Sequence, residues 1–460
     1  MFVKLTASKE NAKMLAAILD IDESQATALL DVTVLITPAK DDVSSFMAAQ
    51  LHNLLSRTVS KVVLRDSYKE KPIVEVIIGN QSSRSESPKI WVSLTEEQIM
   101  VSIVSLESKV IPSLHPALIL LGACYVAASV LKIVMGNSQD QSDVIINYHE
   151  LLGDDIDLFK NEVDLANSYL AGAGAIGNAF LYALQFFNVK GQLYIVDPKR
   201  ISEGNLNRCM FFNRVDVGFF KAERLSIIAQ PFFKKLKLTS YNTTLRNVPE
   251  RSDGPWLKKL IVCVDSRRTR RSLQSEIPGE VFDASTTDIR EIVLHFNKQP
   301  TTKACLSCIY YEEPDELAHE KHVAEVLGVT INDVQKGFIT QEIAEKISTN
   351  YQALNPHEIV GKAFDSLFKQ LCGEGTLRKA GDRQVLAPFS FISVLAGTYL
   401  AIEVIIRVQK PQHDKRFNYW RVSPWASPVP RLRSFRPRRT NCEFCGDDIK
   451  KRVAESLWRK

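Results

Sequence analysis

The stretch Tyr169-Leu-Ala-Gly172-Ala-Gly174-Ala-Ile-Gly177-Asn178 decides the fold. A short apolar strand runs into three glycines spaced as G-x-G-x-x-G, and an apolar helix, Asn178–Phe187, follows them. Such glycines make a tight turn, let the backbone approach a phosphate and leave the helix N-terminus facing the anion. Asp197 stands about twenty residues further on, at the end of a second strand, where an acid would accept ribose hydroxyls. The stretch therefore predicts a Rossmann-like nucleotide-binding unit, although NAD or FAD would fit this pattern equally well.

Short apolar strands and helices alternate on both sides of this loop, which indicates an α/β layer architecture. A chain of 460 residues is too long for one core, so we expect two units, 1–147 and 148–460. In the second unit, strands are predicted at Ser168–Ala171, Leu193–Val196, Leu260–Val264, Val281–Ala284 and Ile292–Phe296. In the first unit, the predicted strands are Val32–Ile36, Lys61–Leu64, Ile73–Ile78, Ile90–Val92 and Val101–Val104. Its predicted helices cover the first thirty residues, Val43–Leu55 and Ala117–Val134.

The first unit lacks a glycine loop after its first strand. The turn at that place, Thr37–Asp42, ends in two aspartates, which would repel a phosphate. If the first unit shares the nucleotide-binding fold, it has therefore lost the nucleotide.

Composition bears on the class of protein. The net charge of +5 is small for this length and favours neither a nucleic-acid nor a membrane partner, although Arg431–Arg439 is locally basic and could dock an acidic partner. The apolar run Ala117–Leu131 has about fifteen residues, short of the ~20 that span a bilayer, so we predict a buried core helix there. The N-terminus shows no signal-peptide pattern. We therefore expect a soluble, cytoplasmic protein.

Three further motifs follow Asp197 in a fixed order. The first is Asn205-Leu206-Asn207-Arg208, the second is Gly218-Phe-Phe-Lys221, and the third is an apolar strand that ends at Asp265 with Arg270 five residues on. In this order and spacing, over about a hundred residues, the chain resembles the ThiF/MoeB and ubiquitin-activating superfamily of ATP-dependent adenylating enzymes. No single motif is as specific as the combination, and the combination strongly disfavours an NAD-dependent oxidoreductase.

The resemblance implies a set of ATP-binding residues: Gly172, Gly174, Gly177, Asp197, Asn205, Arg208, Lys221 and Asp265. Asp197 would bind the ribose, and Asn205, Arg208 and Lys221 the triphosphate. Asp265 would hold Mg²⁺ near the α-phosphate. Arg208, Lys221 and Asp265 would also be catalytic, because cations and Mg²⁺ neutralise charge on the phosphoryl oxygens and the leaving pyrophosphate. Where the family usually has Gln after the arginine, this chain has Cys209.

Two Cys-x-x-Cys pairs, Cys305/Cys308 and Cys442/Cys445, stand far apart in the chain. Without a secretory signal, such pairs favour a metal site over disulfides, and four thiolates build a closed, structural zinc site. Many ThiF/MoeB relatives carry such pairs with a shorter gap between them, and an insertion would produce the wider gap. Two independent redox dithiols are the alternative.

The segment of about 314–388 is predicted to be a helical insertion. Superfamily members that form a thioester keep a cysteine after the adenylation strands, and Cys372 lies in the corresponding part of the chain, before an apolar helix, Phe389–Val408. Its neighbours Lys369, Arg378 and Lys379 would favour the thiolate. The alternatives are that Cys372 is an ordinary loop thiol or that Cys209 is the nucleophile.

The layout resembles fused activating enzymes with a degenerate, inactive first half (1–147) and an active second half (148–460). It is more similar to activators of bacterial ubiquitin-like conjugation operons, including the antiphage Bil type, than to short sulfur-carrier activators. The resemblance implies adenylation of the C-terminal carboxylate of a ubiquitin-like protein, thioester formation on Cys372 and transfer to a conjugating enzyme.

Several alternatives stay open at this point. One is an adenylyltransferase for sulfur transfer or peptide modification without a thioester, and another is a non-catalytic scaffold, against which the intact ATP motifs argue. A homodimer of the whole chain is also open. Relatives supply an arginine across the two halves, and Arg57, Arg65 and Arg84 are the candidates here.

Overall fold

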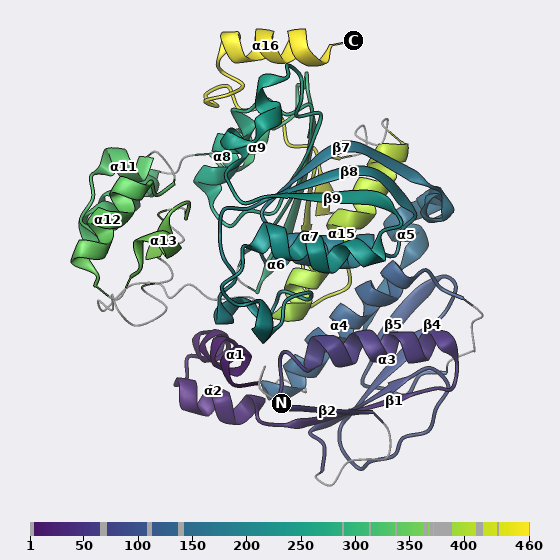
Figure 1. The fold of residues 1–460 in the computed structure, drawn as a ribbon. Helices are drawn as coiled ribbons and strands as arrows, with labels where there is room; N and C mark the ends of the chain where they lie inside the picture. Colours follow the sequence, from purple (N-terminus) through teal and green to yellow (C-terminus); the bar gives the residue numbers. More distant parts are fainter. Residues whose placement is uncertain are drawn as a thin grey trace.

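The computed structural model describes residues 4–64, 71–107, 113–136, 142–287, 289–311, 314–335, 338–352, 354–362, 364, 367–368, 371, 389–410, 417–429 and 432–459. Within these residues the chain forms a six-stranded sheet from its first third and an eight-stranded sheet from the remainder (Figure 1). Both sheets are mostly parallel and are flanked by helices, which confirms the predicted α/β class.

The first sheet has the strand order β2-β1-β3-β4-β5-β6. Its strands are β1 (Thr33–Pro38), β2 (Lys61–Leu64), β3 (Val74–Ile78), β4 (Lys89–Leu94), β5 (Gln98–Ser102) and β6 (Val144–Asn147). The first four strands pair in parallel, and the last two add in antiparallel fashion. The helices of this part are α1 (Lys4–Leu19), α2 (Glu23–Leu30), α3 (Asp42–Leu55) and α4 (Pro116–Val134). Every residue of β1 and β3 is buried, as expected of central parallel strands covered on both faces.

The second sheet has the order β14-β13-β12-β11-β10-β7-β8-β9. Its strands are β7 (Val163–Ala171), β8 (Val189–Val196), β9 (Lys235–Tyr241), β10 (Lys259–Val262), β11 (Glu280–Thr287), β12 (Glu291–Lys298), β13 (Tyr419–Val422) and β14 (Arg433–Ser434). Strands β7 to β11 are parallel. The accompanying helices are α5 (Tyr148–Leu152), α6 (Ala175–Leu184), α7 (Lys221–Ala229), α8 (Arg267–Gln274), α9 (Leu306–Ile309), α15 (Ser390–Gln409) and α16 (Asp448–Trp458).

The chain order in this second sheet creates a switch point beside β7. The chain proceeds from β7 to β8 and β9 on one side, and then crosses to β10 and β11 on the other. In open α/β sheets, ligands bind outside the carboxyl ends of the strands at such a point. The ends of β7, β8 and β10 are therefore the expected position of a ligand site.

Two long apolar helices join the units. Helix α15 packs on α6 of its own unit and on α4 of the first, and a hydrogen bond of 2.9 Å links the hydroxyls of Tyr125 and Tyr399. By length and composition, α4 and α15 could each cross a membrane, but 94% of the most apolar window of each is buried in the protein. Burial in a shared core explains their apolarity, and α4 is the core helix that the sequence predicts.

A helical insert projects beside the second sheet (Figure 1). It comprises α10 (Pro314–Leu327), α11 (Ile331–Gln335), α12 (Gln341–Asn350) and α13 (Pro356–Ile359). Its buried apolar residues, among them Leu327, Ile347 and Phe364, form a cluster separate from the main core. The described part of the predicted insertion is therefore helical and has a small core of its own.

Candidate nucleotide site and cysteine cluster

The glycine loop connects β7 to α6 at the switch point. Gly172 has φ of +99°, and a Cβ added there would lie 2.7 Å from the carbonyl oxygen of Cys263. At Gly177, an added Cβ would collide with the carbonyl oxygen of Gly172 itself. Gly174 is the N-cap residue of α6 and makes no side-chain cap, so the backbone N–H groups of the first helical turn face outward for an anion. The loop thus has the geometry predicted from its spacing.

Two acids stand beside this loop, at the ends of the two strands that flank β7. Asp197 follows β8 and is 6% exposed, and its oxygens accept 2.8 Å hydrogen bonds from the backbone N–H groups of Ala173 and Lys199. Asp265 follows β10, and its carboxylate lies 3.0 and 3.3 Å from Nζ of Lys199. Lys199 therefore connects the two predicted nucleotide acids, although the sequence patterns do not single it out.

Lys221 is the first residue of α7 and is almost fully buried. Its backbone N–H donates a 2.9 Å hydrogen bond to the carbonyl oxygen of Lys199. Burial lowers the pKa of Lys221, the charge of Asp197 raises it, and the charge of Lys199 lowers it again. A bound phosphate would stabilise the charged form of an ammonium that is desolvated and close to a second cation.

The segment with the Asn-Leu-x-Arg motif forms a turn that is stabilised by hydrogen bonds among its own residues. The N–H of Ser202 donates to Oδ1 of Asn205 over 3.0 Å. The guanidinium of Arg208 donates to the carbonyl oxygen of Gly204 and to Oδ1 of Asn207, over 2.6 and 2.8 Å. Arg208 is half-buried, and its charge and that of Lys221 lower the pKa of the neighbouring Cys209, whereas that of Asp197 raises it.

The first unit supports this turn from across the junction. Asn207, which is fully buried, donates to Oδ1 of Asn11 in α1 over 3.0 Å. The guanidinium of Arg57 donates to the carbonyl oxygens of Leu206 and Met210, the second over 3.0 Å. Neither Asn11 nor Asn207 is predicted as a site residue, because their pairing depends on chain segments far apart in sequence. Of the three candidate arginines, Arg57 makes this contact, and burial lowers its pKa.

The other two candidate arginines are Arg84 and Arg65. The backbone N–H of Arg84 donates to the carboxylate of Glu75, within the first unit. Arg65 lies outside the described residues.

Arg270, the arginine five residues after Asp265, has a structural role. Its Nε donates to Oδ1 of Asp283 over 2.9 Å, and its Nη2 donates to the carbonyl oxygen of Ala284 over 3.1 Å. The hydroxyl of Tyr310 donates to the other oxygen of Asp283 over 2.5 Å. Because Arg270 and Asp283 are both buried, this pair fastens α8 to β11.

Cys209 is a poor nucleophile in this structure. Its thiol is 1% exposed, and burial raises its pKa, although Arg208, Lys221 and Arg57 oppose that shift. Since the thiolate is the nucleophilic form, these surroundings disfavour Cys209 for acyl transfer. The other candidate, Cys372, lies outside the described residues.

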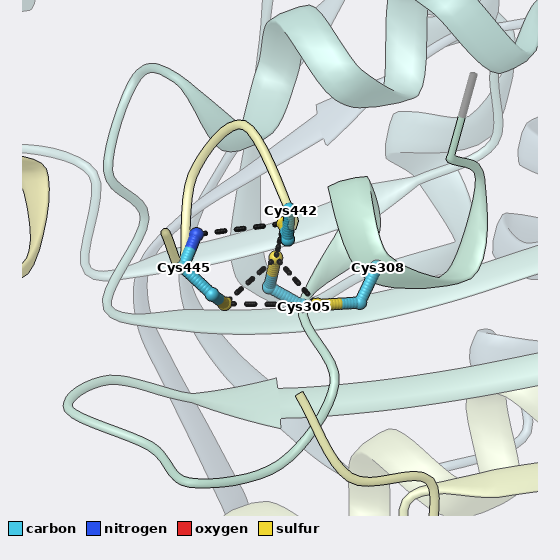
Figure 2. A group of neighbouring side chains, drawn as sticks. All are labelled: Cys305, Cys308, Cys442 and Cys445. Carbon is cyan, nitrogen blue, oxygen red and sulfur yellow. Dashed lines mark hydrogen bonds between the residues drawn. The ribbon is translucent and has the colours of Figure 1, made fainter. Parts of the chain in front are cut away.

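The two Cys-x-x-Cys pairs meet in one cluster (Figure 2). The Sγ atom of Cys305 lies 3.7 Å from those of Cys308 and Cys442 and 3.4 Å from that of Cys445. A tetrahedral zinc ion with Zn–S bonds of about 2.3 Å requires sulfurs about 3.8 Å apart, so the donor set and its spacing fit zinc. The N–H of Arg439 points to Sγ of Cys308 over 3.3 Å, as expected of a thiolate ligand's outer shell. Four buried sulfurs in one cluster argue against two independent redox dithiols.

The helical insert contacts the nucleotide site on two sides. Arg268 of α8, three residues after Asp265, forms an ion pair with buried Glu320 of α10 and donates to the carbonyl oxygen of Val334 over 3.4 Å. Gly361, with φ of +77°, packs so closely on Pro198 that an added Cβ would lie 2.9 Å from the Cβ of Pro198. Because Pro198 directly follows Asp197, the insert borders both strand ends that carry the predicted nucleotide acids.

A glycine loop, acids at the ends of the two strands that flank it and a buried lysine define a nucleotide-binding α/β enzyme fold. Comparison with protein families places it further: the E1 N-terminal domain model matches residues 4–148, and the ThiF family model matches residues 161–444. The chain belongs to the ThiF family, within the ThiF/MoeB and ubiquitin-activating superfamily. It is also 25% identical over 423 residues to an uncharacterized protein, y4jF, of Sinorhizobium fredii (strain NBRC 101917 / NGR234), covering 83% of this chain and 78% of that protein.

Membership of this family establishes the general chemistry. ThiF-type proteins are ATP-dependent adenylyltransferases, so nucleotide binding and adenylation are the activity class of this chain. The E1 match over the first unit agrees with a ubiquitin-like protein as the class of substrate that such a family suggests.

Proposed function

We propose that the second unit adenylates the C-terminal carboxylate of a ubiquitin-like protein, and that Cys372 then receives the acyl group as a thioester for transfer to a conjugating enzyme. The observation that carries the proposal is the convergence of Asp197, Lys199, Lys221 and Asp265 beside the glycine loop, at the switch point of the second sheet. This assembly pairs acids for ribose and metal with cations for phosphates.

In the first step, a carboxylate oxygen attacks the α-phosphorus of ATP and the bond to the bridging oxygen of pyrophosphate breaks. The products are an acyl-adenylate and pyrophosphate. In this proposal, Arg208 and Lys221 offset the charge that grows on the phosphoryl oxygens. Asp197, held by two backbone N–H groups, keeps lone pairs on both oxygens for ribose hydroxyls.

Magnesium fits the exposed acid of this site. The side chain of Asp265 is 61% exposed, and Mg²⁺ in nucleotide enzymes usually takes one or two carboxylates, together with phosphate oxygens and water. Bound there, the ion would supply charge neutralisation at the phosphates. Asp265 is the ligand that this chain provides.

The first unit is proposed to be inactive toward nucleotide. Oδ1 of Asp41 accepts a 2.7 Å hydrogen bond from the N–H of Ser44, so the N-terminus of α3 is capped by an acid of its own chain. An anion would meet a carboxylate at that place. The proposed role of the first unit is support, through Asn11 and Arg57, of the turn that carries Arg208.

The thioester step rests on the position of the insert. In that step the Cys372 thiolate attacks the acyl carbon, a thioester bond forms, and AMP leaves with the electrons of the broken C–O bond. Leu371, the residue before Cys372, is 1% exposed within the insert core, and the insert contacts Pro198 and Arg268 beside the proposed adenylate site. Leu371 thereby belongs to a body that contacts the proposed site.

An adduct assay tests both steps. We expect the full chain, ATP and Mg²⁺ to form a thiol-sensitive adduct with a ubiquitin-like protein encoded by a neighbouring gene, and to form none without ATP. Cys372→Ala should abolish the adduct, whereas Cys124→Ala, which removes a buried thiol of α4, should keep it. An adduct that persists in Cys372→Ala would place the nucleophile elsewhere. Acyl-adenylate without any adduct in the wild-type chain would instead support sulfur transfer or peptide modification.

A further inference from the structure

Lys199 occupies the centre of the proposed nucleotide site. Its backbone N–H donates to Asp197, its carbonyl oxygen accepts from the N–H of Lys221, and its ammonium contacts both oxygens of Asp265. One residue thus touches the proposed ribose acid, a proposed phosphate cation and the proposed magnesium acid. The proposed function counts Lys199 among the cations for phosphates and leaves its contact with Asp265 unexplained.

The ion pair between Lys199 and Asp265 is built to be exchanged. The side chain of Lys199 is 18% exposed, whereas that of Asp265 is 61% exposed, so solvent screens the pair. Such half-exposed pairs shift an equilibrium by only about fivefold or less. A lysine also has a flexible four-carbon stem and three rotatable donors, so its ammonium can turn to another oxygen while its backbone bonds stay in place.

We infer that Lys199 is a nucleotide-binding residue that changes partners: it neutralises Asp265 in the empty site and turns to a phosphate oxygen of ATP when Mg²⁺ takes Asp265. This inference rests on the proposed function. The charges stay balanced throughout, because Asp265 exchanges one cation for another and Lys199 exchanges a carboxylate for a phosphate.

The alternative arrangements leave a charge in a worse position. If Lys199 kept Asp265, the ammonium would block the carboxylate that is to hold magnesium. If Lys199 released Asp265 without gaining a phosphate, its charge would stand near that of Lys221, which already has little contact with water. Partner exchange is the arrangement that pairs both Lys199 and Asp265 in the two states.

Two substitutions should shift magnesium binding in opposite directions. Lys199→Met keeps the length of the side chain without its charge. Mg²⁺ then no longer competes with an ammonium for Asp265, so the half-saturating Mg²⁺ concentration should fall about two- to fivefold. ATP affinity at saturating Mg²⁺ should fall about tenfold in the same variant, because a charge-assisted contact to phosphate is lost. Lys199→Arg offers a planar fork that matches a carboxylate, so it should hold Asp265 more tightly and raise the half-saturating Mg²⁺ concentration.

Calorimetric titration of ATP into the full chain, at a series of Mg²⁺ concentrations, measures both quantities without any ubiquitin-like protein. The expected order of half-saturating Mg²⁺ is Lys199→Met below wild type and Lys199→Arg above it. Equal values in the three proteins, or the reverse order, overturn the inference while ATP binding by the wild-type chain upholds the proposed function. A wild-type chain that binds no ATP overturns the proposed function and the inference with it. Lys199→Arg keeps the charge, so the comparison with wild type stands even if Lys199→Met does not fold.

Discussion

Removing one sulfur from the cysteine cluster should release the metal and loosen the end of the chain. Cys305 is the best position, because its Sγ contacts the sulfurs of Cys308, Cys442 and Cys445 and is fully buried. A serine hydroxyl at that place does not replace a thiolate as a zinc ligand. The link that is then lost joins two segments that lie 137 residues apart in the chain, at Cys305 and Cys442.

The size of the effect follows from metal linkage. At zinc concentrations a thousandfold above the dissociation constant, binding stabilises the folded state by about 4 kcal/mol. For a unit of this size, that loss lowers the unfolding midpoint by roughly 5–8 °C. The four cysteines of the cluster belong to a small core separate from the main one, so the sheets should remain folded while the region around α9 and α16 loosens.

Metal analysis and calorimetry of the purified chain measure this prediction. The wild-type chain should contain about one zinc ion per chain, and Cys305→Ser should contain almost none and unfold at the lower midpoint. Cys124→Ala is the matched control, since it removes a buried thiol outside the cluster and should keep the zinc. A wild-type protein that is folded and free of metal, or a Cys305→Ser variant with unchanged midpoint and zinc content, would refute the assignment.

Three further predictions concern the glycine loop and the insert. Gly177→Ala should destabilise the chain by about 1–3 kcal/mol, because its Cβ collides with the carbonyl oxygen of Gly172. A Cβ at Gly174 would meet nothing within 4 Å, so Gly174→Ala should leave the thermal midpoint unchanged. The same Cβ should weaken ATP binding because it crowds the phosphate. Equal ATP affinity of the variant and wild type in titrations would contradict the placement of phosphate at this loop. Arg268→Ala should undock the insert, because buried Glu320 loses its cation at a cost of about 2–3 kcal/mol, and limited proteolysis should then cleave the insert faster than in wild type. An unchanged cleavage rate would show that other contacts hold the insert.

Local patterns predicted the parts of the site that local chemistry determines. The G-x-G-x-x-G spacing located the β7–α6 turn. Positive φ at Gly172, and close backbone approach at both Gly172 and Gly177, require glycine whatever surrounds them. The apolar runs located α4 and α15, because burial on all sides requires apolar residues throughout. The cysteine spacing predicted a cluster of four sulfurs, which the fold brings within 4.8 Å of one another.

Contacts between segments far apart in the chain could not be predicted from sequence patterns. Asn207 and Asn11 are 196 residues apart, and nothing in either local stretch marks them as partners. The Lys199–Asp265 ion pair depends on β8 and β10 flanking β7, which a linear pattern does not contain. Strand β9 was also missed: it is the edge strand of its sheet, and its exposed Lys235 and Lys237 interrupt the apolar signal. The roles of Asn205, Arg208, Lys221 and Asp265 toward ATP, and that of Cys372 toward a carrier, stay predictions.

ATP–pyrophosphate exchange tests the central claim most directly. With a ubiquitin-like protein encoded by a neighbouring gene, the wild-type chain should incorporate labelled pyrophosphate into ATP, because adenylation is reversible before the acyl group leaves AMP. Asp265→Ala should reduce this exchange at least a hundredfold, about the effect of removing a ligand that neutralises transition-state charge. Exchange that proceeds unchanged in Asp265→Ala would contradict the account of this site.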